Sequence, residues 1–255
     1  MPSASSSART RPRRALRRRL SPDARRAELM ACALKVFARR GLGEARHAEI
    51  AAEAGVSVAT VFFYYPTREA LVDAVLDAVD RFLIDMAAGV HAGAGPAEVV
   101  LLNHIRAFAA SVDSSPSHAR IWLDWSTAVR EQVWQRYLEF LDRMLAIVRR
   151  TLERGQREGA ISQRSDPDDQ ARLLVGSAHM LALMKFAGSP PDKLEHFFAT
   201  LMEAVIGRPA ARGIAVAAPA ASKSGARAAP AASKSVARAA PAASKSSASP
   251  RRRKP

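Results

Sequence analysis

The sequence is poor in the residues on which disulfide, metal and membrane chemistry depend. Its 255 residues include a single cysteine, Cys32, so no disulfide can form within the chain. The six histidines are scattered, and no Cys-x-x-Cys or His-x-x-x-His pair suits a metal ion. No apolar run is long enough to span a membrane. These absences favour a cytoplasmic protein without a metal or other cofactor.

Motifs of catalysis are missing as well. The chain has no glycine-rich phosphate loop and no Gly-x-Ser-x-Gly nucleophile elbow. No other reactive constellation stands out among its histidines, carboxylates and hydroxyl groups. We therefore expect no enzymatic activity, and the positive charge of the chain turns attention to nucleic acid instead.

Acidic residues are absent from both ends of the chain. The whole sequence has 39 basic and 24 acidic side chains, and every acid lies between Asp23 and Glu203. Residues 1–20 hold seven arginines, and residues 208–255 hold eleven basic residues. The net charge of +15 therefore comes from two tails, while the middle of the chain is slightly acidic.

The first tail, residues 1–20, is expected to be a disordered basic arm. Its arginines directly precede the first helix, where an extended arm can enter a minor groove and respond to its width. A solvated charge run without a DNA contact is the alternative.

The second tail, residues 208–255, repeats an eleven-residue unit rich in alanine, lysine and proline and ends in Arg251-Arg252-Arg253-Lys254. Its units have almost no large apolar side chain, so we expect it to be disordered. Its composition resembles the tails of histone-H1-like bacterial proteins, which suggests added sequence-independent affinity for DNA. A solvated low-complexity extension explains the same composition.

Between the tails, residues 47–64 carry the clearest functional signal. A short helix over 47–54 is followed by Gly55, a position where a left-handed residue costs least. Ser57 can then cap a second helix over 58–64. Two short helices joined in this way form a helix-turn-helix, whose second helix enters a DNA major groove. An ordinary helical hairpin is the alternative.

The faces of this recognition helix, residues 58–64, can also be predicted. We expect Ser57, Thr60, Phe63 and Tyr64 near the exposed side and Val58, Val61 and Phe62 on the packing side. Ala59 is small enough to approach a thymine methyl group.

Helix signals flank the motif on both sides. Ser21-Pro22 predicts the start of a helix that ends at Arg39-Arg40-Gly41, and Pro66-Thr67 precedes a long helix. Residues 21–67 are thus a predicted DNA-binding domain, called the head below. Residues 68–207 are the predicted regulatory and dimerisation domain, called the helical domain.

The head resembles the TetR family of bacterial regulators. The likeness rests on Val36-Phe37-Ala38-Arg39-Arg40-Gly41, Ile50-Ala51-Ala52, Val56-Ser57, Phe62-Phe63-Tyr64-Tyr65 and Arg68-Glu69-Ala70-Leu71. His47-Ala48, Pro66-Thr67 and the segment Ile121-Trp122-Leu123-Asp124-Trp125-Ser126 are similar to the LuxR/HapR/SmcR branch of quorum-sensing master regulators. One departure is Phe63, because that branch typically has an asparagine there, whose amide can read adenine.

The resemblance implies a set of DNA-contacting residues. These are Arg17, Arg18, Arg19, His47, Ser57, Val58, Ala59, Thr60, Phe63, Tyr64, Tyr65 and Arg68. Because Phe63 cannot form the bidentate hydrogen bonds of asparagine, the operator of the branch is not carried over to this chain.

The fold expected for the remainder is all-α, with nine helices in the whole chain. Proline and capping residues predict helices near 68–90, 97–112, 117–128, 131–158, 167–187 and 191–206. The helix from 131 has one apolar stripe. The helix from 167 is apolar on nearly all sides, and the helix from 191 has a wide apolar face. These last two helices must each bury two surfaces.

One of those surfaces is expected to meet a second copy of the chain in a four-helix interface, as the family resemblance also implies. The expected interface residues are Leu174, Leu181, Leu194, Phe197, Phe198, Leu201, Met202 and Val205. A homodimer suits DNA reading, since two heads on a two-fold axis match a pseudo-palindromic operator.

The resemblance further implies a pocket for a small apolar ligand between the middle helices. Its expected lining is Phe82, Met86, Ile105, Phe108, Trp122, Phe140, Met144, Val175 and His179. His179 or His104 could supply a polar contact, although an ordinary filled core explains each of these side chains equally well.

Two functions are compatible with the sequence. The first is a sequence-specific transcription regulator, global in the LuxR/HapR manner, and the second is an architectural, histone-H1-like DNA binder whose tails dominate. They differ in the ratio of specific to nonspecific affinity. Either one places the protein in the cytoplasm, at the nucleoid.

Overall fold

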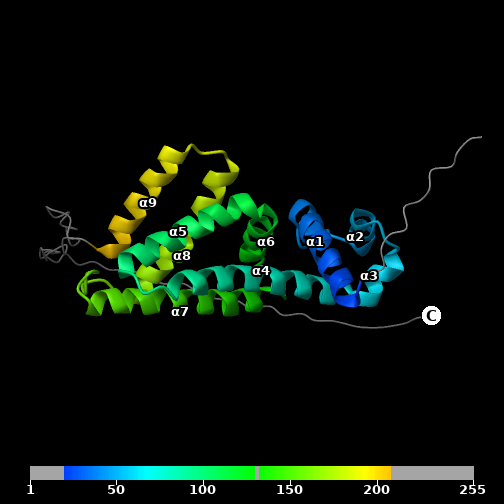
Figure 1. The fold of residues 1–255 in the computed structure, drawn as a ribbon, viewed down its shortest axis with the longest axis horizontal. Coiled ribbons are helices and arrows are strands. Elements are labelled where there is room, and N and C mark those ends of the chain that lie inside the picture. The colour runs from blue at the N-terminus through cyan, green and yellow to red at the C-terminus, as the bar shows by residue number, and fades with distance from the viewer. Residues whose placement is uncertain (1–19, 130–131, 208–255) are drawn as a thin grey trace, which may run out of the picture. The chain divides into compact units, whose positions relative to one another are not determined.

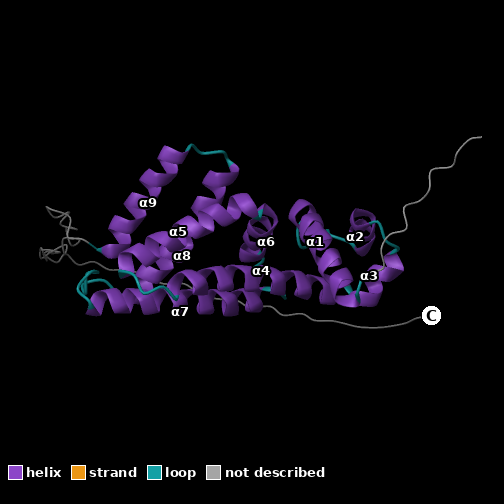
Figure 2. Ribbon diagram, viewed as in Figure 1, coloured by secondary structure: helices purple, strands orange, loops and turns teal. Residues whose placement is uncertain are grey.

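The computed structural model describes residues 20–129 and 132–207, and within these ranges every regular element is a helix (Figures 1 and 2). Nine helices occur there: α1 (Pro22–Arg40), α2 (His47–Ala54), α3 (Val58–Tyr64), α4 (Arg68–His91), α5 (Ala97–Ser114), α6 (Pro116–Thr127), α7 (Trp134–Arg157), α8 (Pro167–Phe186) and α9 (Pro191–Ile206). The all-α prediction is confirmed. Apart from Leu20, the two basic tails lie outside the described residues, and so does the disorder predicted for them.

Side-chain caps mark where four of the nine described helices begin, α1, α3, α4 and α8. The Ser21 hydroxyl accepts a hydrogen bond from the Ala24 amide, and Thr67 does the same for Ala70 at the start of α4. At α8 the Asp166 carboxylate accepts from the Asp168 amide. Each side chain satisfies a backbone donor that the first helical turn leaves without a partner.

The start of α7 differs from its prediction. The helix begins at Trp134 rather than at residue 131, and residues 130 and 131 lie outside the described ranges. The indole nitrogen of the fully buried Trp125 donates to the Val133 carbonyl at 2.9 Å. This contact between α6 and the turn before α7 is tertiary, so no local sequence signal reveals it.

The helical domain is layered around α4 and α7, which run side by side (Figure 1). The inner stripe of α7 is formed by Tyr137, Phe140, Met144, Val148 and Leu152, all buried. Helices α5 and α8 cover this stripe, and α9 packs on α5 and α8. The head joins the same core, because α1 packs along α6 and also contacts α4.

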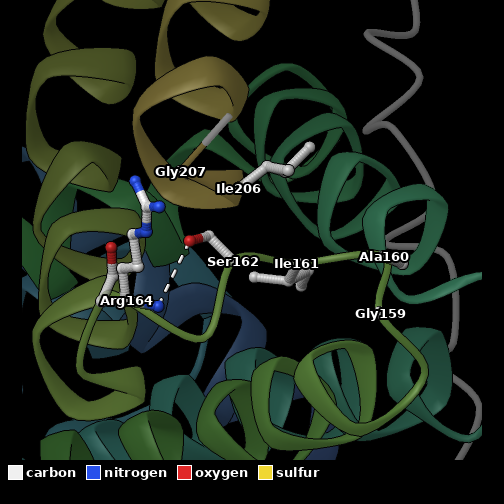
Figure 3. A pocket seen from close by; sticks show the side chains of 8 residues that line it. Gly159, Ala160, Ile161, Ser162, Arg164, Ile206 and Gly207 are labelled. Carbon is white, nitrogen blue, oxygen red and sulfur yellow. Dashed lines mark hydrogen bonds between the residues drawn. The ribbon is translucent and has the colours of Figure 1, made fainter. Parts of the chain in front are cut away.

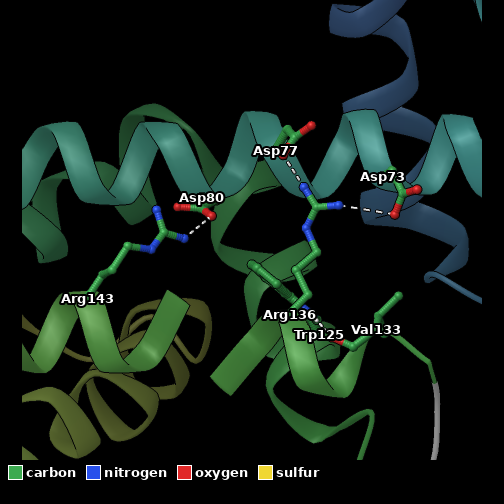
Figure 4. A network of polar contacts seen from close by, with 7 residues as sticks. All are labelled: Asp73, Asp77, Asp80, Trp125, Val133, Arg136 and Arg143. Atoms are coloured by element: carbon green, nitrogen blue, oxygen red, sulfur yellow. Dashed lines mark hydrogen bonds and ion pairs between the residues drawn. The ribbon is translucent and has the colours of Figure 1, made fainter. Parts of the chain in front are cut away.

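Arginines of α7 face a row of aspartates on α4, as Figure 4 shows. Arg136 lies between Asp73 and Asp77 and pairs with both carboxylates, and Arg143 pairs with Asp80. Asp73 and Asp77 are exposed, so water and salt screen these two pairs and they add little to stability. They lie at the end of the α4–α7 contact nearest the head (Figures 1 and 4).

Gly155 allows a close approach between elements of the helical domain. A β-carbon at this buried position would lie 2.6 Å from Cδ1 of Ile161 and 2.7 Å from Cβ of Ala97. The first turn of α5 and the connection after α7 can therefore pack directly on the backbone of α7.

Replacing Gly155 with alanine is expected to destabilise the protein by about 1–3 kcal/mol, because the added methyl group overpacks this contact. Gly89→Ala is the matched control, since Gly89 lies in α4 with open space around it. Alanine there should stabilise the fold by about 0.5–1 kcal/mol through helix propensity. Chemical denaturation measures both; equal effects would contradict the close packing at Gly155.

Candidate DNA interface

The turn between α2 and α3 has the geometry that its sequence predicts. Gly55 adopts a left-handed conformation with φ 61° and ψ 40°, and the Val56 amide donates back to the Ala51 carbonyl at 3.0 Å. The chain then reverses into α3, where the Ser57 hydroxyl accepts from the Thr60 amide at 3.2 Å. This is the helix-turn-helix geometry.

Helix α3 exposes more apolar surface than predicted. Val61 is fully buried and anchors the helix, but Val58 is 41% exposed and Phe62 is 45% exposed, so the prediction that these two pack inward was wrong. Phe63 is 80% exposed. Ala59 is also exposed, and the short helix therefore presents a continuous apolar outer surface.

Two residues predicted to contact DNA, His47 and Tyr65, point inward. The His47 ring is buried, donates from Nε2 to the Tyr65 carbonyl at 2.8 Å, and stacks on Phe62 with 4.2 Å between ring centroids. Tyr65 is only 4% exposed, and burial raises the pKa of its hydroxyl, an effect that Arg26 partly offsets. These two side chains support α3 from behind.

Arg68 and the exposed Asp124 hold the turn after α1. The Arg68 guanidinium donates to the carbonyl oxygens of Leu42 and Gly43, and the Asp124 carboxylate of α6 accepts the Leu42 amide hydrogen at 2.6 Å. Gly41 has φ 80°, and a β-carbon there would lie 3.2 Å from Asp124 Oδ2. We call this arrangement the Leu42 clamp: it ties the head to α4 and α6.

Sequence reasoning did not identify the role of Asp124. Its partner is a backbone amide 82 positions away, and a backbone amide has no sequence signature. Arg68 was predicted to contact DNA, but in this structure its guanidinium is directed at the turn after α1.

The remaining predicted contacts surround α3. Ser57, Ala59, Thr60, Phe63 and Tyr64 line one shallow surface hollow together with Leu20 and Pro22 at the start of the described chain. Arg17, Arg18 and Arg19 lie outside the described residues. They directly precede Leu20 in the sequence, and Leu20 itself lines the hollow beside α3.

Comparison with known proteins identifies the head. Residues 29–75 match the family described as bacterial regulatory proteins, tetR family. The HTH-type transcriptional regulator LuxR of Vibrio harveyi is 36% identical over 170 residues, which cover 65% of this chain and 80% of LuxR. The chain belongs to the TetR family. It falls in the LuxR-like branch, and the family is one of regulators rather than enzymes.

Solved structures share the fold. A TetR-like regulator from Rhodococcus sp. RHA1 has a TM-score of 0.63 at 20% identity and matches 74% of this chain and all (100%) of its own. The TetR family regulator CifR, solved with a 26-base-pair operator DNA, has a TM-score of 0.61 at 17% identity over 70% of this chain and 96% of its own. FadR of Bacillus subtilis, solved with stearoyl-CoA, has a TM-score of 0.60 at 18% identity. The match covers 71% of this chain and 97% of the FadR chain.

Family membership decides between the two functions left open by the sequence. The chain is a sequence-specific, DNA-binding transcriptional regulator that acts as a homodimer, and not an architectural DNA binder. No helix in the described ranges combines the length and apolarity that a membrane span needs.

The helical domain contains a small, mostly apolar cavity of about 30 Å³. Six of the predicted pocket residues line it, and three do not. The six are Met86, Phe108, Trp122, Phe140, Met144 and Val175, joined by Leu83, His104, Tyr137, Leu141 and Ala178. The three that lie apart from it are Phe82, Ile105 and His179. A ligand stays a prediction, and this cavity would have to widen to admit one.

A chain of buried polar groups ends at this cavity. Nδ1 of His91 lies 2.7 Å from the Thr151 hydroxyl, and Nε2 of His91 lies 3.0 Å from Nδ1 of His104. Burial lowers the pKa of His104 to about 3 and that of His91 to about 4. To a smaller extent, the charge of Arg154 also lowers the pKa of His91, and His91 does the same for His104. Both rings are therefore neutral at pH 7, and each has one nitrogen that donates and one that accepts a hydrogen bond.

His179 has a different partner. Its Nε2 lies 2.8 Å from the Ser126 hydroxyl, and its ring packs against Trp122. It therefore connects α8 to α6, the helix that also carries Asp124.

A second hollow, shown in Figure 3, lies where the connection after α7 meets the end of α9. The Ser162 amide donates to the Ile206 carbonyl at 3.0 Å, and the Ser162 hydroxyl accepts from the Arg164 amide. Gln156 donates to the Ser162 and Ser165 carbonyls. These polar groups hold the connection in place because they form hydrogen bonds with one another.

Most side chains predicted for the dimer interface are already buried inside the protomer. Leu174, Leu181, Leu194, Phe198, Leu201, Met202 and Val205 are each at most 8% exposed, and Phe197 is partly buried. They attach α8 and α9 to the rest of the helical domain. The large apolar side chains that α8 leaves exposed are instead Leu173, Met180 and Leu183.

The Leu42 clamp makes a specific prediction. Asp124→Ala should lower the free energy of unfolding by about 1 kcal/mol, because the largely buried Leu42 amide loses its acceptor. Asp142→Ala is the matched control, an exposed aspartate of α7 without a recorded ion pair. Thermal unfolding compares the two, and an Asp124→Ala protein as stable as the control would show that the clamp contributes nothing.

Proposed function

We propose that two α3 helices of the homodimer read the two halves of a pseudo-palindromic operator, and that the arginines of residues 1–20 contact the adjacent minor groove. The observation that supports this proposal is α3 itself. One side of it is anchored by Val61 and by the inward-facing His47, while its other side is free. The head is clamped to the helical domain, so both reading helices move with the dimer.

The likeness to LuxR supports a global role for this regulator, with many operators rather than one. Its place of action would then be the cytoplasm, in association with the nucleoid. The eleven basic residues of 208–255 would add affinity that does not depend on sequence.

Selection of bound fragments from a random-sequence DNA library tests the proposal. We expect two inverted half-sites whose centres lie about one helical turn, about 34–36 Å, apart. The full chain and a chain ending at residue 207 should select the same sites, since the tail carries no base-reading role. Enrichment without a common sequence would contradict the proposal.

We further propose that the dimer face is formed by Leu173, Met180 and Leu183 of α8. Their exposed fractions are 46%, 52% and 54%, and positions 173, 176, 180 and 183 recur at the spacing of one helix face. Gly176 leaves open space at the middle of this face, where a second helix can approach closely. Such an exposed apolar stripe on a soluble helix marks an interface.

Met180→Glu should convert the dimer into a monomer at micromolar concentration, because two carboxylates would have to be buried across the two-fold axis. Operator affinity should fall by at least about tenfold, since each monomer reaches only one half-site. Light scattering and operator titration measure the two effects.

Val129→Glu serves as the control. Val129 is an equally apolar residue, 58% exposed, on the connection after α6 and not on α8. A Met180→Glu protein that remains dimeric would exclude this face.

A further inference from the structure

The stretch of sequence that carries the reading helix lacks every side chain that reads a base through paired hydrogen bonds. From Gly55 to Thr67 the sequence contains no arginine, lysine, asparagine, glutamine, aspartate or glutamate. Arg25 of α1 also lines the hollow beside α3, but its guanidinium pairs with Glu28. Arginine and lysine are the usual readers of guanine, and asparagine and glutamine of adenine. Helix α3 therefore distinguishes bases by another route.

The hydroxyl groups of Ser57 and Thr60 have little capacity left for hydrogen bonds to bases. The Ser57 and Thr60 hydroxyls lie 2.8 Å apart and bond to each other, so one of the two hydrogens is already used. Ser57 also accepts the Thr60 amide hydrogen as the helix cap. These groups are occupied in holding the start of the helix.

What α3 presents outward is apolar. Phe63 is 80% exposed, and its ring meets that of Tyr64 edge-on, at 5.2 Å between centroids. Ala59 lies one turn earlier on the same side of the helix, and both line the hollow next to Pro22. A phenylalanine so exposed in the last turn of a DNA-reading helix needs an apolar partner in the groove.

The major groove has one such partner, the C5-methyl group of thymine. We propose that this regulator selects its operators through thymine methyl groups, with Phe63 as the principal specificity-determining residue and Ala59 beside it. Each half-site then contains at least one thymine whose methyl group packs against the Phe63 ring. The inference rests on the proposed function and adds the chemistry by which bases are chosen.

Deoxyuracil substitution tests the inference, because it removes only the methyl group. In the selected operator, each half-site thymine is replaced in turn by deoxyuracil, and the dissociation constant of the full chain is measured at fixed salt. One substitution should weaken binding about fourfold, and the symmetric pair about fifteenfold, as expected for burial of one methyl group per half-site.

Variants assign the effect to its residue. Phe63→Ala should bind the thymine operator more weakly and lose its sensitivity to uracil at that position. Phe62→Ala is the comparison variant. Phe62 precedes Phe63 in the chain, but it is only 45% exposed and its ring stacks on His47, so this variant should keep the sensitivity to uracil. Circular dichroism confirms that both variants are folded.

A gain of binding provides the complementary readout. Cytosine at the same position should bind poorly, and 5-methylcytosine should restore part of the affinity of the wild-type protein but not of Phe63→Ala.

The outcomes separate the inference from the proposed function. If a discrete operator is selected but uracil has no effect at any thymine, the methyl-reading role is overturned and the regulator role stands. If Phe63→Ala weakens binding to the thymine and uracil operators equally, Phe63 contacts the backbone or inserts between bases, which also overturns the inference. If no common sequence is selected, both fail.

Discussion

The position of the reading helix depends on how the short turn between α1 and α2 is held. Asp124 of α6 accepts the Leu42 amide hydrogen, and Arg68 of α4 donates to the carbonyls of Leu42 and Gly43. The head thus has polar contacts to two helices of the other domain in addition to the packing of α1 on α6. A regulator that must present two α3 helices at a fixed spacing needs such a connection.

The same helix, α6, links the clamp to the interior. Trp122 lines the small cavity, Asp124 holds the turn, and Ser126 bonds to His179 of α8. Trp122 and Asp124 are two positions apart, so the cavity wall and the Leu42 clamp share one short helix. Of the two neutral histidines only His104 lines this cavity, and His91 bonds to it from behind. The rest of the wall is aliphatic and aromatic and includes Tyr137.

Sequence reasoning succeeded where structure is decided locally. Ser57, Gly55 and Asp166 set helix ends through capping and a left-handed turn, which neighbouring residues determine almost alone. It failed where distant residues decide. Val58 and Phe62 are exposed because only one side of so short a helix meets the head, and the inner side of α8 is selected by α5, α7 and α9. Asp124 has a backbone partner that no residue pattern reveals.

The most direct measurement of the clamp is hydrogen exchange of the Leu42 amide in the full-length dimer. The Leu42 residue is 5% exposed and its amide hydrogen is bonded to Asp124, so its exchange should be slowed to the level of the amides in the middle of α1. Exchange at the rate of an unprotected loop amide would contradict the account, because the head would then lack the connection that fixes its reading helix.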